Sequence, residues 1–188
     1  MKPETYLHIR NSVRDWGYGD DIDWSEGVGP PADSSSFARE AVFVIANSGM
    51  HHVAAQAIFN AVMRALTDGQ SASTVFRHPG KSGAMDSIWK DRDALFQAFI
   101  ACGDADRRLA FCKTLPWIGE ITKYHLAKNL GADVAKPDRW MDRVAAKFNT
   151  DPHSLCSRLS EATGDRVATV DVVLWRACAV GIYDPEAM

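Results

Sequence analysis

Hydrophobic side chains recur along most of this chain at the three- to four-residue spacing of an amphipathic helix. The run Val42–Ile45 is apolar on every face, as expected for a helix buried within a bundle. Toward the C-terminus, the same spacing places Val170, Val173 and Leu174 on one face. No segment has the pattern of a convincing strand, and no repeat is present. The pattern therefore predicts an all-α fold.

Capping residues and helix breakers divide this pattern into predicted helices and loops. The predicted helices cover residues 6–16, 37–47, 53–66 and 85–102, a stretch ending near 114, 120–130, and three more beginning at Asp138, Asp151 and Thr169. Ser34–Ser36 would cap the second helix. Segments 16–36 and 73–83 are predicted loops. We expect the first loop to be anchored by packing of Trp16, Tyr18 and Trp24, although such side chains can also stack on a base.

The stretch from Asp106 to Val144 contains the most informative local signals. Pro116 cannot continue the helix before it, and Gly131 is a natural stop for the helix after it. Gly119 is expected to adopt a backbone conformation that other residues resist. These signals predict two helices joined by a tight hairpin at 115–119. The start of the second helix would present backbone N–H groups, which favour an anion such as a DNA phosphate.

A carboxylate follows this hairpin at the start of the next predicted helix. Pro137 and Asp138 open that helix, in which Trp140, Val144 and Phe148 are expected to be buried. A later helix would bury its face at Leu155, Leu159 and Ala162. Asp138 on its own has two interpretations. It is an N-cap of ordinary kind, or it is a carboxylate placed to stabilise positive charge in a reaction.

Length and charge narrow the partners of this 188-residue chain. It is long enough for one domain or two lobes that share a cleft, and it has neither a membrane-length apolar run nor the core of a signal peptide. We expect a cytoplasmic monomer. A net charge of −3 argues against a generic nucleic-acid binder, but residues 107–147 carry nine bases against four acids. That local excess favours an anionic partner for the hairpin.

The cysteines point away from metal chemistry. Cys102, Cys112, Cys156 and Cys178 are widely spaced and form no CxxC pair. Buried free thiols are therefore expected in place of a zinc site or a disulfide framework. We expect no metal and no cofactor.

Together these motifs resemble the helix-hairpin-helix (HhH-GPD) DNA glycosylase superfamily, which includes endonuclease III and its adenine- and 8-oxoguanine-removing relatives. The hairpin Leu115-Pro116-x-Ile118-Gly119 is followed by Thr122 and Gly131. Asp138 comes at nearly the family's distance, and Arg143-Val144 follows five residues later. The match covers residues 106–148, and the flanking helices agree in number and order.

The resemblance implies a two-lobed helical fold with a cleft between the lobes. One lobe would span 36–133 with the helix-hairpin-helix at 106–131, and the other 1–35 plus 134–188, in one compact unit. The hairpin would hold double-stranded DNA while one nucleotide swings out of the stack. The DNA-binding residues would be Pro116, Trp117, Gly119, Thr122 and Lys123. Asp138 would take the place of the catalytic aspartate.

The resemblance also suggests where the extruded base would lie. In relatives, the break between the first two core helices lies near the lesion. The corresponding residues here are Asn47, Ser48, Met50, His51 and His52, which are alternatively a polar helix start. Trp117 occupies a hairpin position where the family often has glycine, and its role stays open between a contact within the protein and a contact with DNA.

Two departures from the family define the expected activity. Members that also cut the strand have a lysine two residues after the hairpin glycine, where this chain has Ile121, and Lys123 lies on a different face of the helix. Some members also end with four clustered cysteines that bind an iron–sulfur cluster, which the wide cysteine spacing of this chain cannot supply. The resemblance therefore implies a monofunctional DNA glycosylase that leaves an abasic site, acting in repair or in defence against modified phage DNA. The alternatives are a non-catalytic helix-hairpin-helix DNA-binding module, and a lyase that uses Lys123 or Lys136.

Overall fold

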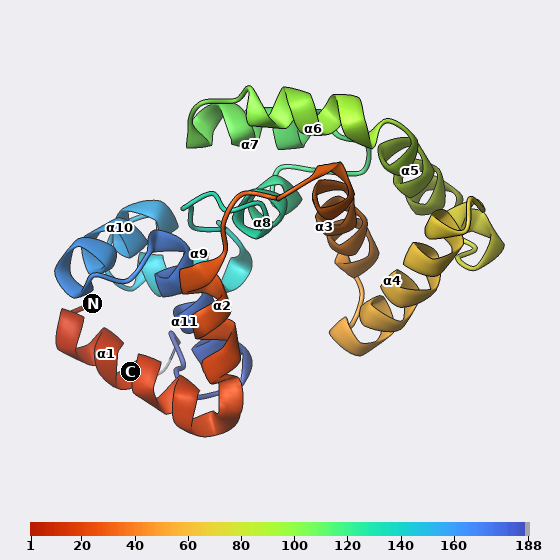
Figure 1. Ribbon diagram of the computed structural model, residues 1–188. Coiled ribbons are helices and arrows are strands. Elements are labelled where there is room, and N and C mark those ends of the chain that lie inside the picture. Colours follow the sequence, from red (N-terminus) through yellow and green to blue (C-terminus); the bar gives the residue numbers. More distant parts are fainter. Residues whose placement is uncertain (187–188) are drawn as a thin grey trace. The chain divides into compact units, whose positions relative to one another are not determined.

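The computed structural model describes residues 1–186, except for the side chain of His52, and within that part the regular elements are all helical, with no strand (Figure 1). The predicted all-α class is confirmed. The chain divides into two units, Met1–Gly29 with Ala132–Met188, and Pro30–Gly131. These boundaries lie a few residues from those expected for the two lobes. Within the described residues, no helix is long and apolar enough to cross a membrane.

The first unit joins the two ends of the sequence around one central helix. Helix α11 (Val167–Ala179) contacts α1 (Pro3–Val13), α2 (Gly19–Gly27), α9 (Arg139–Ala146) and α10 (Pro152–Thr163). In Figure 1, the red helices α1 and α2 lie beside the blue helix α11. The apolar stripe predicted for this helix is buried: Val170, Val173, Leu174, Ala177 and Cys178. The helix begins two residues before the predicted Thr169.

The prediction of a loop over residues 16–36 is wrong, because residues 19–27 form α2. A π-helical turn, Arg14–Tyr18, joins α2 to α1, and Gly17 bends the chain there with a φ of 92°. Ile22 is fully buried, and the buried Ser25 hydroxyl lies 3.0 Å from the Thr169 hydroxyl of α11. These tertiary contacts override the weak helix propensity of the Gly- and Asp-rich sequence.

The aromatic residues of this segment do not all pack as predicted. Trp16 is 63% exposed and Trp24 is 47% exposed, so neither anchors the segment. Tyr18 is half-buried, and the Arg176 guanidinium lies 4.5 Å from the centre of its ring.

Burial on the helices that follow Asp138 also differs in part from the prediction. Val144 is buried, while Trp140 and Phe148 are half-buried. Ala162, expected to be buried, is exposed near the end of α10.

The second unit is likewise built around one apolar helix, α3 (Ser34–Asn47). It contacts α4 (His52–Thr67), α5 (Pro79–Lys90), α6 (Arg92–Ile100) and α8 (Thr122–Asn129). The remaining elements are a short 3-10 turn, Ala72–Thr74, and α7 (Ala105–Thr114). Phe37 packs against Phe99 and Phe111, with ring centroids 5.5 and 6.3 Å away. Asn129 on α8 donates a hydrogen bond to Glu40 on α3 at 2.9 Å, and burial raises the pKa of that carboxyl.

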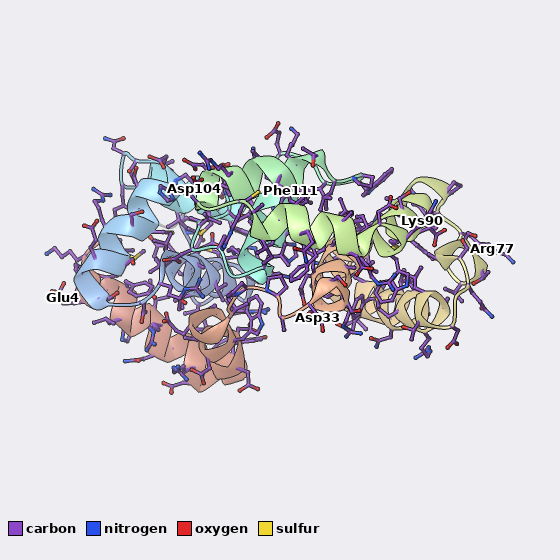
Figure 2. All side chains as sticks on the ribbon, turned by 45° about the horizontal axis from the view of Figure 1, so that its top comes forward. Glu4, Asp33, Arg77, Lys90, Asp104 and Phe111 are labelled. Atoms are coloured by element: carbon purple, nitrogen blue, oxygen red, sulfur yellow. The ribbon has the colours of Figure 1, made fainter. Side chains whose placement is uncertain are left out.

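Several predicted boundaries in this unit need correction. The cap of α3 is Asp33 and not the serines, although Ser36 completes a capping box with it. Asp104 caps α7 in the same manner, and Figure 2 marks both aspartates at the starts of their helices. The predicted loop 73–83 ends early, because Pro79 occupies the first turn of α5, and the single helix predicted over 85–102 is divided at Asp91.

We predict that Tyr6→Phe lowers the free energy of unfolding by about 1.5–3 kcal/mol, the usual range for a hydrogen bond to a charged group. Tyr6 is fully buried, and its hydroxyl donates to Asp165 Oδ2 at 2.6 Å. The Arg10 Nε atom lies 2.9 Å from the same oxygen but off the hydrogen-bond direction, so that contact is electrostatic. Urea denaturation measures the loss. An unchanged midpoint would contradict the assignment.

Candidate functional site

The predicted hairpin of the second unit is a tight turn with an unusual residue at its third position. The Ile118 N–H donates to the Leu115 carbonyl at 3.2 Å, which places Pro116 and Trp117 at the two central positions. Trp117 has a φ of 67°. Turns of this kind normally have glycine there, because side chains make a positive φ unfavourable. Trp117 thus occupies a position whose left-handed backbone favours glycine.

Packing within the second unit explains how Trp117 holds this conformation. Its ring lies edge-on to the ring of His78, with centroids 5.2 Å apart. A Cβ atom on Gly80 would lie only 2.4 Å from its Cζ3 atom. The indole therefore rests on the bare backbone of the first turn of α5. Of the two roles left open by the sequence, the structure contains the contact within the protein, and the indole is still 46% exposed.

The expectation that Gly119 adopts a backbone conformation that other residues resist is wrong. Gly119 is not among the residues with positive φ, and a Cβ atom there would meet only the Thr122 hydroxyl, at 3.9 Å. Glycine is therefore not required by the fold at this position. The Gly119 N–H donates to that hydroxyl at 2.7 Å, while the N–H groups of Glu120 and Ile121 have no acceptor in the described part of the chain. Those two groups are available to an anion.

The positive charge around the hairpin is more balanced than the sequence suggests. Glu120 forms ion pairs with Lys113 and with Lys123, whose Nζ lies 2.7 Å from Oε2. Lys128 is 8% exposed and cannot reach a ligand easily. Exposed ion pairs contribute little stability, so the two paired lysines can turn to an approaching phosphate at small cost. Ile121, two residues after Gly119, is 42% exposed.

Asp138 lies in the first unit, where it caps α9 as predicted. Its Oδ1 atom accepts hydrogen bonds from the N–H groups of Trp140 and Met141 at 3.1 and 3.3 Å. Its Oδ2 atom lies 3.3 Å from Lys136 Nζ. The side chain is 14% exposed. Within residues 1–186, one oxygen is therefore held by backbone N–H groups, and the other lies against a lysine ammonium.

Asp171 helps to position Lys136 and Asp138, and sequence reasoning did not identify it. It lies on α11, is 1% exposed, and accepts a hydrogen bond from the Lys136 N–H at 3.1 Å. The Asp138 N–H donates to the Lys136 carbonyl at 2.8 Å, closing a tight turn around Pro137. An Asp inside an apolar stripe was the signal that could have identified it, since a buried carboxylate must have partners.

A buried thiol lies close enough to Asp138 to feel its charge. Burial, followed by the negative charges of Asp138 and Asp184, raises the pKa of Cys178 to about 11. The thiol therefore stays protonated at neutral pH and is not a nucleophile. All four cysteines are free, and Cys112, Cys156 and Cys178 are buried while Cys102 is half-buried.

The residues expected to line a base pocket form the turn between α3 and α4. Asn47, Ser48 and Met50 are half-buried, and His51 is exposed and makes no capping hydrogen bond. The His52 side chain lies outside the described residues. Lys81, a buried lysine that sequence reasoning assigned to a loop, donates to the Ser48 carbonyl at 2.6 Å, and burial lowers its pKa. Lys81 thus holds this turn in place.

A groove of the second unit lies elsewhere on these two helices. Its volume is about 340 Å³, and it is lined mainly by residues 59–68 of α4 and its C-terminal cap, with Arg39 of α3, and not by the turn at 47–52. Its lining residues are Arg39, Phe59, Asn60, Met63, Arg64, Thr67 and Asp68. Among the described residues, no group of three His, Cys, Asp or Glu side chains is arranged to hold a metal ion.

Comparison with known proteins adds no family to this geometry. No protein-family model, no curated protein and no solved structure matches this chain. The two candidate features, the hairpin and the capped carboxylate, therefore rest on their own geometry and on the resemblance of their motifs.

We predict that Gly80 and Trp117 are energetically coupled. Gly80→Ala should destabilise the protein by about 1–3 kcal/mol, the usual cost of overpacking, because the new methyl group collides with the indole. In a Trp117→Gly background the same change should be neutral or stabilising, since alanine favours a helix over glycine. Urea denaturation of the four proteins measures the coupling. Equal effects in both backgrounds would show that the indole does not rest on Gly80.

Proposed function

We propose that this protein is a monofunctional DNA glycosylase, which extrudes a damaged or modified base from duplex DNA and hydrolyses its N-glycosidic bond. The observation that carries the proposal is the capped Asp138 carboxylate, which follows in the sequence a helix-hairpin-helix whose Glu120 and Ile121 N–H groups have no acceptor among the described residues. Backbone N–H groups at a helix start suit a DNA phosphate, and one fixed carboxylate suits a reaction that develops positive charge.

The proposed chemistry needs little more than that carboxylate. As the bond from the base to C1′ breaks, positive charge develops on the sugar, and the negative charge of Asp138 stabilises it. Water adds to C1′, its proton is lost, and the base leaves with the electron pair of the broken bond and takes up a proton. The products are the free base and an abasic site in an intact strand.

Water is the expected nucleophile because the usual amine is missing. Ile121 occupies the lyase-lysine position, and Lys123, two residues further on, lies on a different face of the helix. Lys136 places another amine 3.3 Å from the Asp138 carboxylate. A lyase that uses Lys136 or Lys123 would still be a glycosylase, with a different second step.

One observation favours a second candidate, a non-catalytic helix-hairpin-helix module that only binds DNA. The position of Asp138 is fully accounted for by helix capping and by its ion pair with Lys136, with no catalytic role needed. A binding module requires the hairpin but has no use for this carboxylate as a charge. The two candidates therefore differ in what the protein releases from DNA.

The deciding experiment incubates the protein with duplexes that carry oxidised, alkylated or mismatched bases, and with modified phage genomes. Released base is then measured by mass spectrometry. The proposal expects free base and a strand that breaks only after hot alkali, with no covalent adduct on borohydride treatment. Binding without base release across the whole panel would favour the module. A covalent adduct that is lost in Lys136→Ala or in Lys123→Ala would show that this lysine, and not water, is the nucleophile.

Asp138→Asn tests the role of the charge alone. Asparagine caps a helix as well as aspartate does, so α9 and the overall fold should be retained. We expect base release to fall at least a hundredfold, in line with the size of such electrostatic effects, while DNA affinity stays within a few-fold. Single-turnover assays and DNA titrations measure the two quantities. Turnover above about a tenth of wild type would leave Asp138 as a cap only.

Gly119→Val tests the hairpin. A Cβ atom fits at Gly119 without a clash and its φ is not in the left-handed region, so we expect thermal stability to change little. DNA binding should weaken for all sequences alike, because the added methyl groups would stand between the backbone N–H groups and a phosphate. Titration of unrelated duplexes measures this, with unfolding curves as the control. A loss restricted to particular sequences would contradict the assignment.

A further inference from the structure

The ion pair between Lys136 and Asp138 is puzzling in a site that is meant to stabilise positive charge. An ammonium 3.3 Å from the Asp138 carboxylate cancels much of its field at the place where the sugar cation would form. Arg139 and Arg143 on the same helix have guanidinium groups 5.4 Å from the Trp140 ring, and within the described residues neither is paired with Asp138. The positive charge that offsets the Asp138 carboxylate is therefore that of Lys136.

The surroundings of Lys136 allow its ammonium to leave while its backbone stays. The backbone is fixed by Asp171 through its N–H and by Asp138 through its carbonyl. The side chain is 25% exposed and thus open to solvent. Asp138, in contrast, keeps two backbone hydrogen bonds on Oδ1 whether or not the lysine is present. The carboxylate is rigid, and its counterion is movable.

We propose that Lys136 is a DNA phosphate-binding residue that masks Asp138 in the free protein and is drawn off the carboxylate by a backbone phosphate when duplex DNA binds. This inference rests on the proposed function. A phosphate is the natural competitor, because the DNA backbone presents closely spaced negative charges that attract lysine. Once the ammonium has moved, Oδ2 faces the sugar with its full charge. The active site is thereby charged only when DNA occupies it.

The test uses two probe duplexes, so the target base does not have to be known. One contains a neutral tetrahydrofuran abasic analogue, and the other a pyrrolidine analogue whose protonated nitrogen imitates the sugar cation. The ratio of their dissociation constants measures how strongly the site favours positive charge. Repeating both titrations over a range of salt concentrations gives the number of phosphate contacts, since each contributes about 0.9 to the slope of log affinity against log salt.

Lys136→Met should bind both duplexes more weakly, reduce the salt slope by about 0.9, and leave the preference for pyrrolidine unchanged. Lys136→Arg should keep the slope, and Lys2→Met, which removes an exposed lysine at the start of α1, is the matched control for charge. Thermal unfolding confirms that each variant is folded. A purely structural lysine would alter stability without altering either of the two binding readouts.

An unchanged salt slope in Lys136→Met, or a stronger preference for pyrrolidine, would overturn the inference, because the lysine would then remain on Asp138 in the complex. Failure of the proposed function has a different signature. In that case the wild-type protein would show no preference for the pyrrolidine duplex that Asp138→Asn removes. The experiment therefore distinguishes failure of the Lys136 inference from failure of the proposed function.

Discussion

Each unit of this protein depends on one helix that has too little polar surface to face water. Helix α3 is surrounded by α4, α5, α6 and α8, and α11 by α1, α2, α9 and α10. Burial of such a helix is favourable when other helices cover its apolar faces. The position of α8 is thus set by its contacts with α3, and that of α9 by its contacts with α11. Local sequence signals determine where these two helices begin and end.

Aspartate caps recur at the helix starts, and one of them has a second partner. Asp33, Asp104 and Asp151 each accept an N–H from the first turn of their helix. Asp138 does the same but is 14% exposed and has a lysine against its other oxygen. Capping holds a carboxylate rigidly at little cost, because the backbone N–H groups need an acceptor in any case. A reaction that needs one fixed negative charge can use such a residue directly.

The hairpin shows how a local rule is broken and compensated. Trp117 takes a backbone conformation normally left to glycine, at a cost of about 1–3 kcal/mol. Contacts of the indole with His78 and with the backbone at Gly80 offset this cost. Gly119, the residue for which conformational freedom was expected, has an ordinary φ. If its glycine is needed, the reason is the close approach of a ligand and not the fold.

Short-range signals in the sequence were sufficient to predict the all-α class, the hairpin between α7 and α8, the cap at Asp138 and the apolar stripe of α11. These features depend on residues within one or two helical turns of each other. Only the tertiary structure decided that residues 19–27 are helical, that Trp16 and Trp24 are exposed, and that Asp171 holds the backbone of Lys136. Those outcomes depend on partners far away in the chain, such as Thr169 beside Ser25, and no local pattern contains them.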